Sequence, residues 1–177
     1  MPSLLEEKLK VSFLIGYKKT NFKWEARGGT YIYPLSPGDF SKYSKRTFPD
    51  EPAISYEQTI KTPYVGIGLA GNLERFKVSS RLIFSKWAAF EAEDRHYTRD
   101  FRVYYKMKNG KMYSYNINAL YDLTNHFSLG LGYDYTNYDT VRDDSTWDYG
   151  DLEFVFIDNG GANLKTSILS STLTYSF

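Results

Sequence analysis

The sequence predicts an all-β fold: an antiparallel transmembrane β-barrel, of which this chain contains six strands. Three observations predict this class. Apolar and polar side chains alternate along most of the chain, which is typical of strands with one buried face. Aromatic residues make up 18% of the chain, and its 17 tyrosines suit a membrane–water interface. Short turns alternate with long polar loops, as in outer-membrane barrels.

The predicted strands cover residues 9–25, 53–71, 75–94, 99–122, 126–140 and 163–177. In the first strand, every second residue is apolar or aromatic, and we call such a set of alternate residues one parity: Val11, Phe13, Ile15 and Tyr17. In the second strand, apolar residues alternate with glycine and alanine: Val65, Ile67 and Leu69. The third strand runs from the short turn at 71–75 to the charged stretch FEAEDRHYTRD. The stretches 27–52 and 137–162 are rich in Gly, Pro, Asp and Ser, so we expect long loops there.

The last three strands show the same alternation. In 99–122 the apolar parity is Tyr113, Tyr115, Ile117, Ala119 and Tyr121. In 126–140 it is Phe127, Leu129, Leu131, Tyr133 and Tyr135. In 163–177 it includes Leu169, Leu173, Tyr175 and Phe177. The opposite parity holds mostly small polar residues, which fits strands that are wetted on one face only.

Two environments could cover the apolar face. A soluble ligand-binding barrel of the lipocalin type would turn this face inward. A membrane barrel would turn it outward against lipid, with aromatic residues at both ends and a polar interior. The aromatic ends and the small polar face favour the membrane barrel. Six strands are too few to close one, and open edges in lipid are costly, so either strands are missing or chains combine.

Composition excludes several other classes. The 22 basic and 21 acidic residues nearly balance, so no nucleic-acid partner is indicated. The chain has no cysteine, which excludes disulfides and thiolate metal sites. It has no apolar run long enough for a transmembrane helix, and its first residues do not resemble a signal peptide. We expect no metal and no organic cofactor.

The charged stretch FEAEDRHYTRD contains the best candidate for chemistry. Asp94 and His96 lie two residues apart, which places them on one face of a strand. A carboxylate beside an imidazole suits proton transfer, although this spacing by itself is a weak signal. The other histidine, His126, lies in the short turn LTNH and is interpreted as structural. The pair Asp143–Asp144 is interpreted as part of a solvated loop.

Several stretches resemble the omptin family of outer-membrane proteases. The stretch LIGYKKTNFKWEARGGTYIY carries the matching residues Gly16, Tyr17, Phe22, Ala26, Gly28, Gly29, Thr30 and Tyr31. Residues 47–68 resemble the loop and strand that follow, and FSKWAAFEAEDRHY resembles the strand that ends in the family's catalytic Asp-x-His. The resemblance runs from about residue 9 to the end and covers the last six of the family's ten strands. We therefore expect residues 1–177 to be the C-terminal part of such a barrel, with the N-terminal strands absent.

The resemblance implies an aspartic-type endopeptidase of the bacterial outer membrane that cleaves polypeptides near basic residues. Asp94 would orient His96, and His96 would take a proton from the attacking water. An Asp pair on the opposite wall belongs to the family's N-terminal part, and no stretch here matches it. Ala92 stands where the family has an acidic residue of the substrate pocket. We expect this chain alone to be an inactive fragment that an N-terminal barrel fragment could complete.

The resemblance also implies lipopolysaccharide as a partner, because Tyr17 and Lys108 match the family's lipopolysaccharide-contacting positions. Activity could then require lipopolysaccharide, as it does in the family. Two other functions stay open from the sequence. One is a non-enzymatic outer-membrane barrel, either an adhesin or a small pore, which the loss of the acidic residue at Ala92 mildly favours. The other is a product of an interrupted gene with no function of its own.

Overall fold

The computed structural model describes residues 9–36 and 39–177. Residues 1–8, where the sequence predicts no signal peptide, lie outside the described residues. The strands are β1 (Lys10–Ala26), β2 (Thr30–Ser36), β3 (Asp39–Thr47), β4 (Ile54–Leu73), β5 (Phe76–His96), β6 (Phe101–Asp122), β7 (Phe127–Tyr149) and β8 (Leu152–Tyr175), with a short 3₁₀ turn, η1, at Tyr97–Arg99. No helix within the described ranges is long and apolar enough to cross a membrane.

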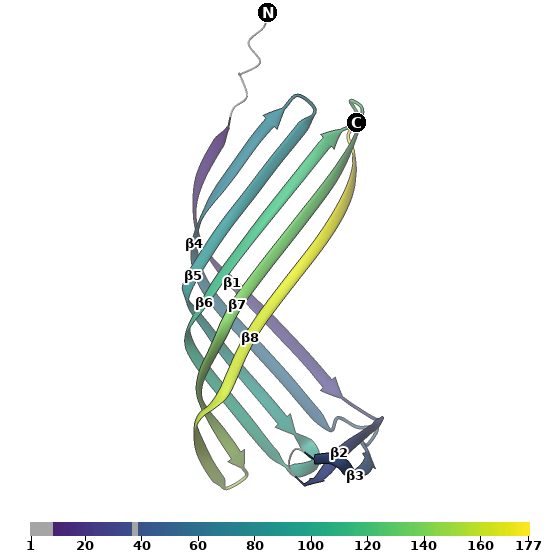
Figure 1. Ribbon diagram of the computed structural model, residues 1–177, viewed down its shortest axis with the longest axis vertical. Coiled ribbons are helices and arrows are strands. Elements are labelled where there is room, and N and C mark those ends of the chain that lie inside the picture. The colour runs from purple at the N-terminus through teal and green to yellow at the C-terminus, as the bar shows by residue number, and fades with distance from the viewer. Residues whose placement is uncertain (1–8, 37–38) are drawn as a thin grey trace, which may run out of the picture.

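Six strands form one antiparallel sheet in the order β1-β4-β5-β6-β7-β8. The strands are long, strongly tilted and curved, and the start of β1 and the end of β8 lie at the same end of the sheet (Figure 1). In the described residues, β1 and β8 each pair with a single strand, so the sheet is part of a barrel that is not closed. The predicted class, a partial antiparallel barrel of six strands, is confirmed.

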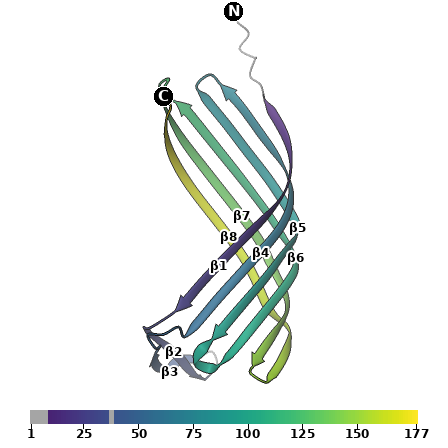
Figure 2. The ribbon, with the colours of Figure 1, turned by 180° about the vertical axis from the view of Figure 1, so that it is seen from behind.

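Both stretches predicted as long loops contain strands instead. Strands β2 and β3 form a separate hairpin at the end of the sheet opposite the termini (Figure 2). In the region 137–162, β7 and β8 continue to a tight turn at Gly150, which has a φ of 66°. The acidic residues there suggested a loop, but the interleaved aromatic and branched residues of STWDY and LEFVFI favour strands.

The half of the sheet nearest the termini has an apolar outer face. Side chains on this convex face have no protein cover; Phe13 is 88% exposed, for example. On β6, the outward stretch from Tyr113 to Tyr121 spans about 20 Å along the membrane normal at a rise of about 3.3 Å per residue and a tilt of about 40°. That height is comparable with the apolar band of outer-membrane barrels, about 25 Å. We therefore call this part the membrane half.

The concave face of the membrane half is small and polar. Gly132 on β7 illustrates why, because a Cβ there would lie 2.6 Å from both Asn118 Oδ1 and Ser170 Oγ. Asn116 Nδ2 donates to Asp134 Oδ1 over 2.8 Å on the same face. Amide, hydroxyl and carboxylate groups thus line the inner side of the sheet where lipid faces the outer side.

Beyond the membrane half, three neighbouring strands each carry one extra residue at a similar height. Register shifts occur between Ser85 and Ala88 on β5, opposite Gly110 and Met107 on β6, and between Tyr138 and Val141 on β7. An extra residue reverses which parity faces inward. On β5, for example, Val78 and Leu82 face outward in the membrane half. Beyond the shift, residues that are also even-numbered, including Asp94, face inward.

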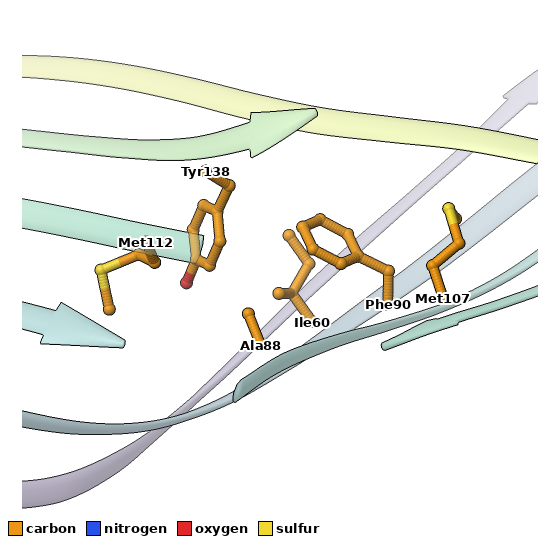
Figure 3. Close-up of a cluster of buried hydrophobic side chains, with 6 residues drawn as sticks. All are labelled: Ile60, Ala88, Phe90, Met107, Met112 and Tyr138. Carbon is orange, nitrogen blue, oxygen red and sulfur yellow. The ribbon is translucent and has the colours of Figure 1, made fainter. Parts of the chain in front are cut away.

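An apolar cluster lies on the concave face at this height. It consists of Ile60, Ala88, Phe90, Met107, Met112 and Tyr138, each at most 1% exposed. The six side chains gather across the hollow of the sheet, with Ile60, Ala88 and Phe90 between Tyr138 and Met107 (Figure 3). Tyr138 also shares a 3.1 Å hydrogen bond with the hydroxyl of buried Thr62. This cluster, which we call the plug, separates the polar inner face of the membrane half from the outer half of the sheet.

Candidate active site

Asp94 and His96 lie on the concave face at the outer end of β5, beyond the plug. The Nε2 atom of His96 is 3.4 Å from Oδ1 of Asp94, and the side chains are 19% and 28% exposed. Oδ1 of Asp94 is buried and has no hydrogen-bond partner in the described residues. The distance is slightly too long for a hydrogen bond, and catalytic contacts often shorten only when substrate is bound.

The tight connection after β5 fixes the position of His96. His96 is the last residue of β5, and η1 follows at once. The backbone N–H of Tyr97 donates to the carbonyl of Ala53 over 3.0 Å, which ties the turn to the start of β4. Asp100 closes the turn in the left-handed conformation, with φ of 49°, and the guanidinium of Arg99 lies 4.9 Å from the ring centre of Tyr33 on the β2–β3 hairpin.

Two tyrosines lie on either side of the Asp94 carboxylate, on β4 and β6. Tyr56 is paired with Asp94 across the β4–β5 ladder, and Tyr105 is paired with Ala92 across the β5–β6 ladder. Burial, and then the negative charge of Asp94, raise the pKa of both phenols. Both therefore stay protonated at neutral pH and are available as hydrogen-bond donors. Sequence reasoning missed both residues, since neither belongs to a recognisable motif.

His96 also has an aromatic neighbour that the sequence did not reveal. Its ring stacks on Phe101 with 4.3 Å between centroids and 12° between planes. Phe101 is the first residue of β6 and pairs directly with His96. The short spacing in the sequence could have predicted this contact, because a turn of only four residues makes His96 and Phe101 direct partners in the ladder. The predicted strand bounds, 75–94 and 99–122, place His96 in the turn and therefore do not pair it with Phe101.

The side chains of β5 next to Asp94 divide between the two faces. Ala92 faces inward and is 7% exposed, so β5 places no carboxylate in the hollow at that position. Glu91 faces outward and binds Lys61 of β4, with Nζ 2.6 Å from Oε2. The guanidinium of Arg95 lies 4.6 Å from the ring centre of Tyr97. The acidic residues around Asp94 in the sequence are thus absent from the wall of the site.

The remaining candidate residues lie apart from this site. Tyr17 and Lys108 both face outward near the edge of the apolar band that borders the outer half of the sheet, but three strand spacings of about 4.8 Å separate them. They do not form one cluster. His126 lies in the turn after β6, with Nδ1 3.0 Å from the carbonyl oxygen of Ser176. No group of three or more potential metal ligands occurs among the described residues.

The Asp143–Asp144 pair belongs to the outer part of β7 and not to a loop. The carboxylate of Asp143 accepts a hydrogen bond from the N–H of Asp144 over 3.0 Å. The carboxylate of Asp144 accepts one from the N–H of Asp158 over 2.9 Å. Both carboxylates therefore serve the local backbone where the β7–β8 register shifts.

Comparison with known proteins identifies relatives of the chain and of its fold. A sequence model of the Omptin family matches residues 3–177. The plasminogen activator of Yersinia pestis is 27% identical over 179 residues, covering 98% of this chain and 55% of the relative. Protease 7 of Escherichia coli (strain K12) is 32% identical over 124 residues, covering 68% of this chain and 38% of the relative. The crystal structure of outer membrane protease OmpT from Escherichia coli superposes with a TM-score of 0.76 at 25% identity, covering 96% of this chain and 58% of that one.

Proposed function

Because the chain belongs to the omptin family of the bacterial outer membrane, we propose that it supplies one wall of an outer-membrane endopeptidase. The observation that carries this proposal is the Asp94–His96 pair, 3.4 Å apart on the concave face beyond the plug. The chain spans 55% of the plasminogen activator and 38% of Protease 7, little more than half of the first relative and less of the second.

Each residue of the pair has a distinct role in the proposed reaction. Asp94 faces Nε2 of His96, so it holds the tautomer in which Nε2 carries the proton and Nδ1 has a free lone pair. Nδ1 then takes a proton from a water molecule while that water attacks the peptide carbonyl. Asp94 stabilises the imidazolium that forms, as buried carboxylates do in other proton-transfer couples. The proton passes finally to the leaving amine.

The opposite wall would come from a polypeptide equivalent to the N-terminal part of the family. In the family it carries an Asp pair that faces the Asp–His couple and binds the attacking water. Loss of one part of a catalytic unit removes most of the rate. We therefore expect the chain alone to have no useful activity. The same polypeptide would pair with the free edges of β1 and β8, whose backbone groups cannot face lipid unpaired.

The surroundings of the site bear on its specificity. Ala92 gives the β5 wall no second carboxylate beside Asp94, so we expect any preference for basic residues to come from the opposite wall. Tyr17 and Lys108 lie on the outer face where lipopolysaccharide headgroups would sit, and we propose them as separate contacts.

A complementation assay tests the proposal. The chain would be refolded in detergent with lipopolysaccharide, alone and together with a four-strand N-terminal fragment of an omptin. Cleavage of a fluorogenic peptide with paired basic residues is the readout. We expect cleavage only in the mixture, loss of cleavage with His96→Ala, and no loss with the matched variant His126→Ala. Cleavage that survives His96→Ala, or no cleavage in the mixture, would contradict the proposal.

A further inference from the structure

Three aromatic rings from β6 and β7 continue the stack that begins at His96. Phe101 lies parallel to Trp147, with centroids 5.5 Å apart and planes within 5°, and it stacks on Tyr149 at 4.9 Å and 24°. Phe101 itself is only 7% exposed. The imidazole is thus the end member of an aromatic column made of His96, Phe101, Trp147 and Tyr149.

The column is anchored on its far side. The indole Nε1 of Trp147 donates to Ser145 Oγ over 3.0 Å, and Ser145 is completely buried. Phe156 of β8 packs edge-on against Trp147, with 5.2 Å between centroids. These contacts leave Trp147 little freedom to rotate, and Phe101 is confined in turn between Trp147 and the imidazole.

The contact with Asp94 alone would not give His96 one orientation. At 3.4 Å, it leaves the ring free to rotate about the line that joins the two groups. A stacked ring restricts that rotation, because aromatic pairs prefer defined offset geometries. Side chains that hold catalytic groups in this way matter because small misplacements cost large factors in rate.

We propose that Phe101, backed by Trp147, is a positioning residue that holds the ring of His96 in the plane in which Nε2 faces Asp94. The inference deepens the proposed function and rests on it for its catalytic meaning. The geometry that it concerns is complete within this chain, however. It can therefore be tested without any cleavage assay.

The test uses the histidine side-chain signals in NMR spectra of the whole chain refolded in detergent micelles. The chain has two histidines, and His126→Gln assigns the signals. In the unaltered chain we expect ring-current shifts that move the His96 carbon-bound protons upfield of those of His126, and nitrogen shifts of a single tautomer with the proton on Nε2. Phe101→Leu should move these proton signals downfield and mix the tautomers, whereas Phe101→Tyr should preserve both.

Two further variants make the result decisive. Phe76→Leu removes a stacked phenylalanine at the other end of β5, where Phe76 packs on Tyr121 at 4.6 Å, and should leave His96 unchanged. Trp147→Leu removes the backing ring and should broaden the His96 signals; it also serves if Phe101→Leu does not refold. His96 signals that stay unchanged in Phe101→Leu, or in Trp147→Leu, would overturn the proposal.

Catalysis gives a separate readout in the complemented assay. Phe101→Leu should lower kcat about 10- to 100-fold with little change in KM, and Phe101→Tyr should restore it. A complemented chain that cleaves nothing even with Phe101 intact would count against the proposed function. The NMR result would still decide whether the column holds His96, so failure of the two proposals can be told apart.

Discussion

The two halves of the long strands differ in which face of the sheet is apolar and which is polar. In the membrane half, the outer face is apolar and exposed, and the inner face is built from glycine, hydroxyl and amide groups. In the outer half, the outer face carries charged pairs such as Lys61–Glu91, and the inner face holds the apolar plug, the aromatic column and Asp94–His96. The backbone is continuous through both halves, so strand geometry alone does not account for the difference.

The surroundings of each half account for it. Where lipid covers the convex face, apolar side chains belong outside, and the hollow is left to polar groups. Where water covers the convex face, charges belong outside, and the hollow can bury apolar rings that hold a reactive pair in place. The extra residues on β5, β6 and β7 lie at the boundary between the lipid-covered half and the water-covered half. Four variants test this difference, and their stability effects can be measured by urea unfolding of the chain refolded in lipid vesicles together with the N-terminal fragment.

The largest loss is expected from Phe90→Ala in the plug. Phe90 is completely buried and stacks edge-on against Tyr138 at 5.6 Å, so removing its ring leaves a cavity. We expect a cost of about 3–5 kcal/mol. The same substitution at Phe154, which is 46% exposed in the outer half, should cost less than about 1 kcal/mol. Equal losses at both positions would show that the plug is not a packed core.

A charge on the lipid-facing surface should have the next largest effect. Ile117 is 51% exposed near the middle of the apolar band, and Ile117→Arg should cost about 2–4 kcal/mol in vesicles. The matched variant Thr146→Arg places the same charge on β7 in the outer half and should be nearly neutral. If Thr146→Arg proved as costly as Ile117→Arg, the boundary between the two halves would be misplaced.

A smaller loss is expected when the polar contact within the plug is removed. Tyr138→Phe keeps the ring but leaves the hydroxyl of completely buried Thr62 without its 3.1 Å partner. We expect a cost of about 1–2 kcal/mol. The double variant Tyr138→Phe/Thr62→Val removes both polar groups and should recover part of that loss. A double variant less stable than Tyr138→Phe would indicate that packing, rather than the hydrogen bond, dominates at this position.

The smallest effect is expected at the exposed ion pair of the outer half. Glu91→Gln removes the negative charge that lies 2.6 Å from Nζ of Lys61, whose side chain is 38% exposed. Exposed ion pairs contribute little to stability and are screened by salt, so the unfolding midpoint should stay within the error of the titration. A clear loss of stability that disappears at high salt would show that the outer face is more strongly coupled than its exposure suggests.

The sequence predicted the membrane half better than the outer half. Strict alternation in stretches such as FSLGLGYDY predicts that the segment is a strand and shows which side chains share its apolar face, because lipid requires apolar residues on every second position. Outside the bilayer that constraint ends, so β2, β3 and the outer parts of β7 and β8 were mistaken for loops. Asp94 and His96 could be picked out because they share a strand face and a family motif. Phe101, Trp147 and Tyr56 could not, since their roles depend on register across neighbouring strands.

The extra residue on β5 between Ser85 and Ala88 has a consequence for how related sequences are aligned. Deleting a single residue there would rotate the rest of β5 by half a turn and present Asp94 and His96 to the outside, with Glu91, Glu93 and Arg95 in the hollow. A one-position gap placed in this segment therefore changes which residues are matched to the inner face of the sheet. In a comparison of omptin sequences, such a gap decides whether Asp94 and His96 are aligned with inward-facing or with outward-facing positions.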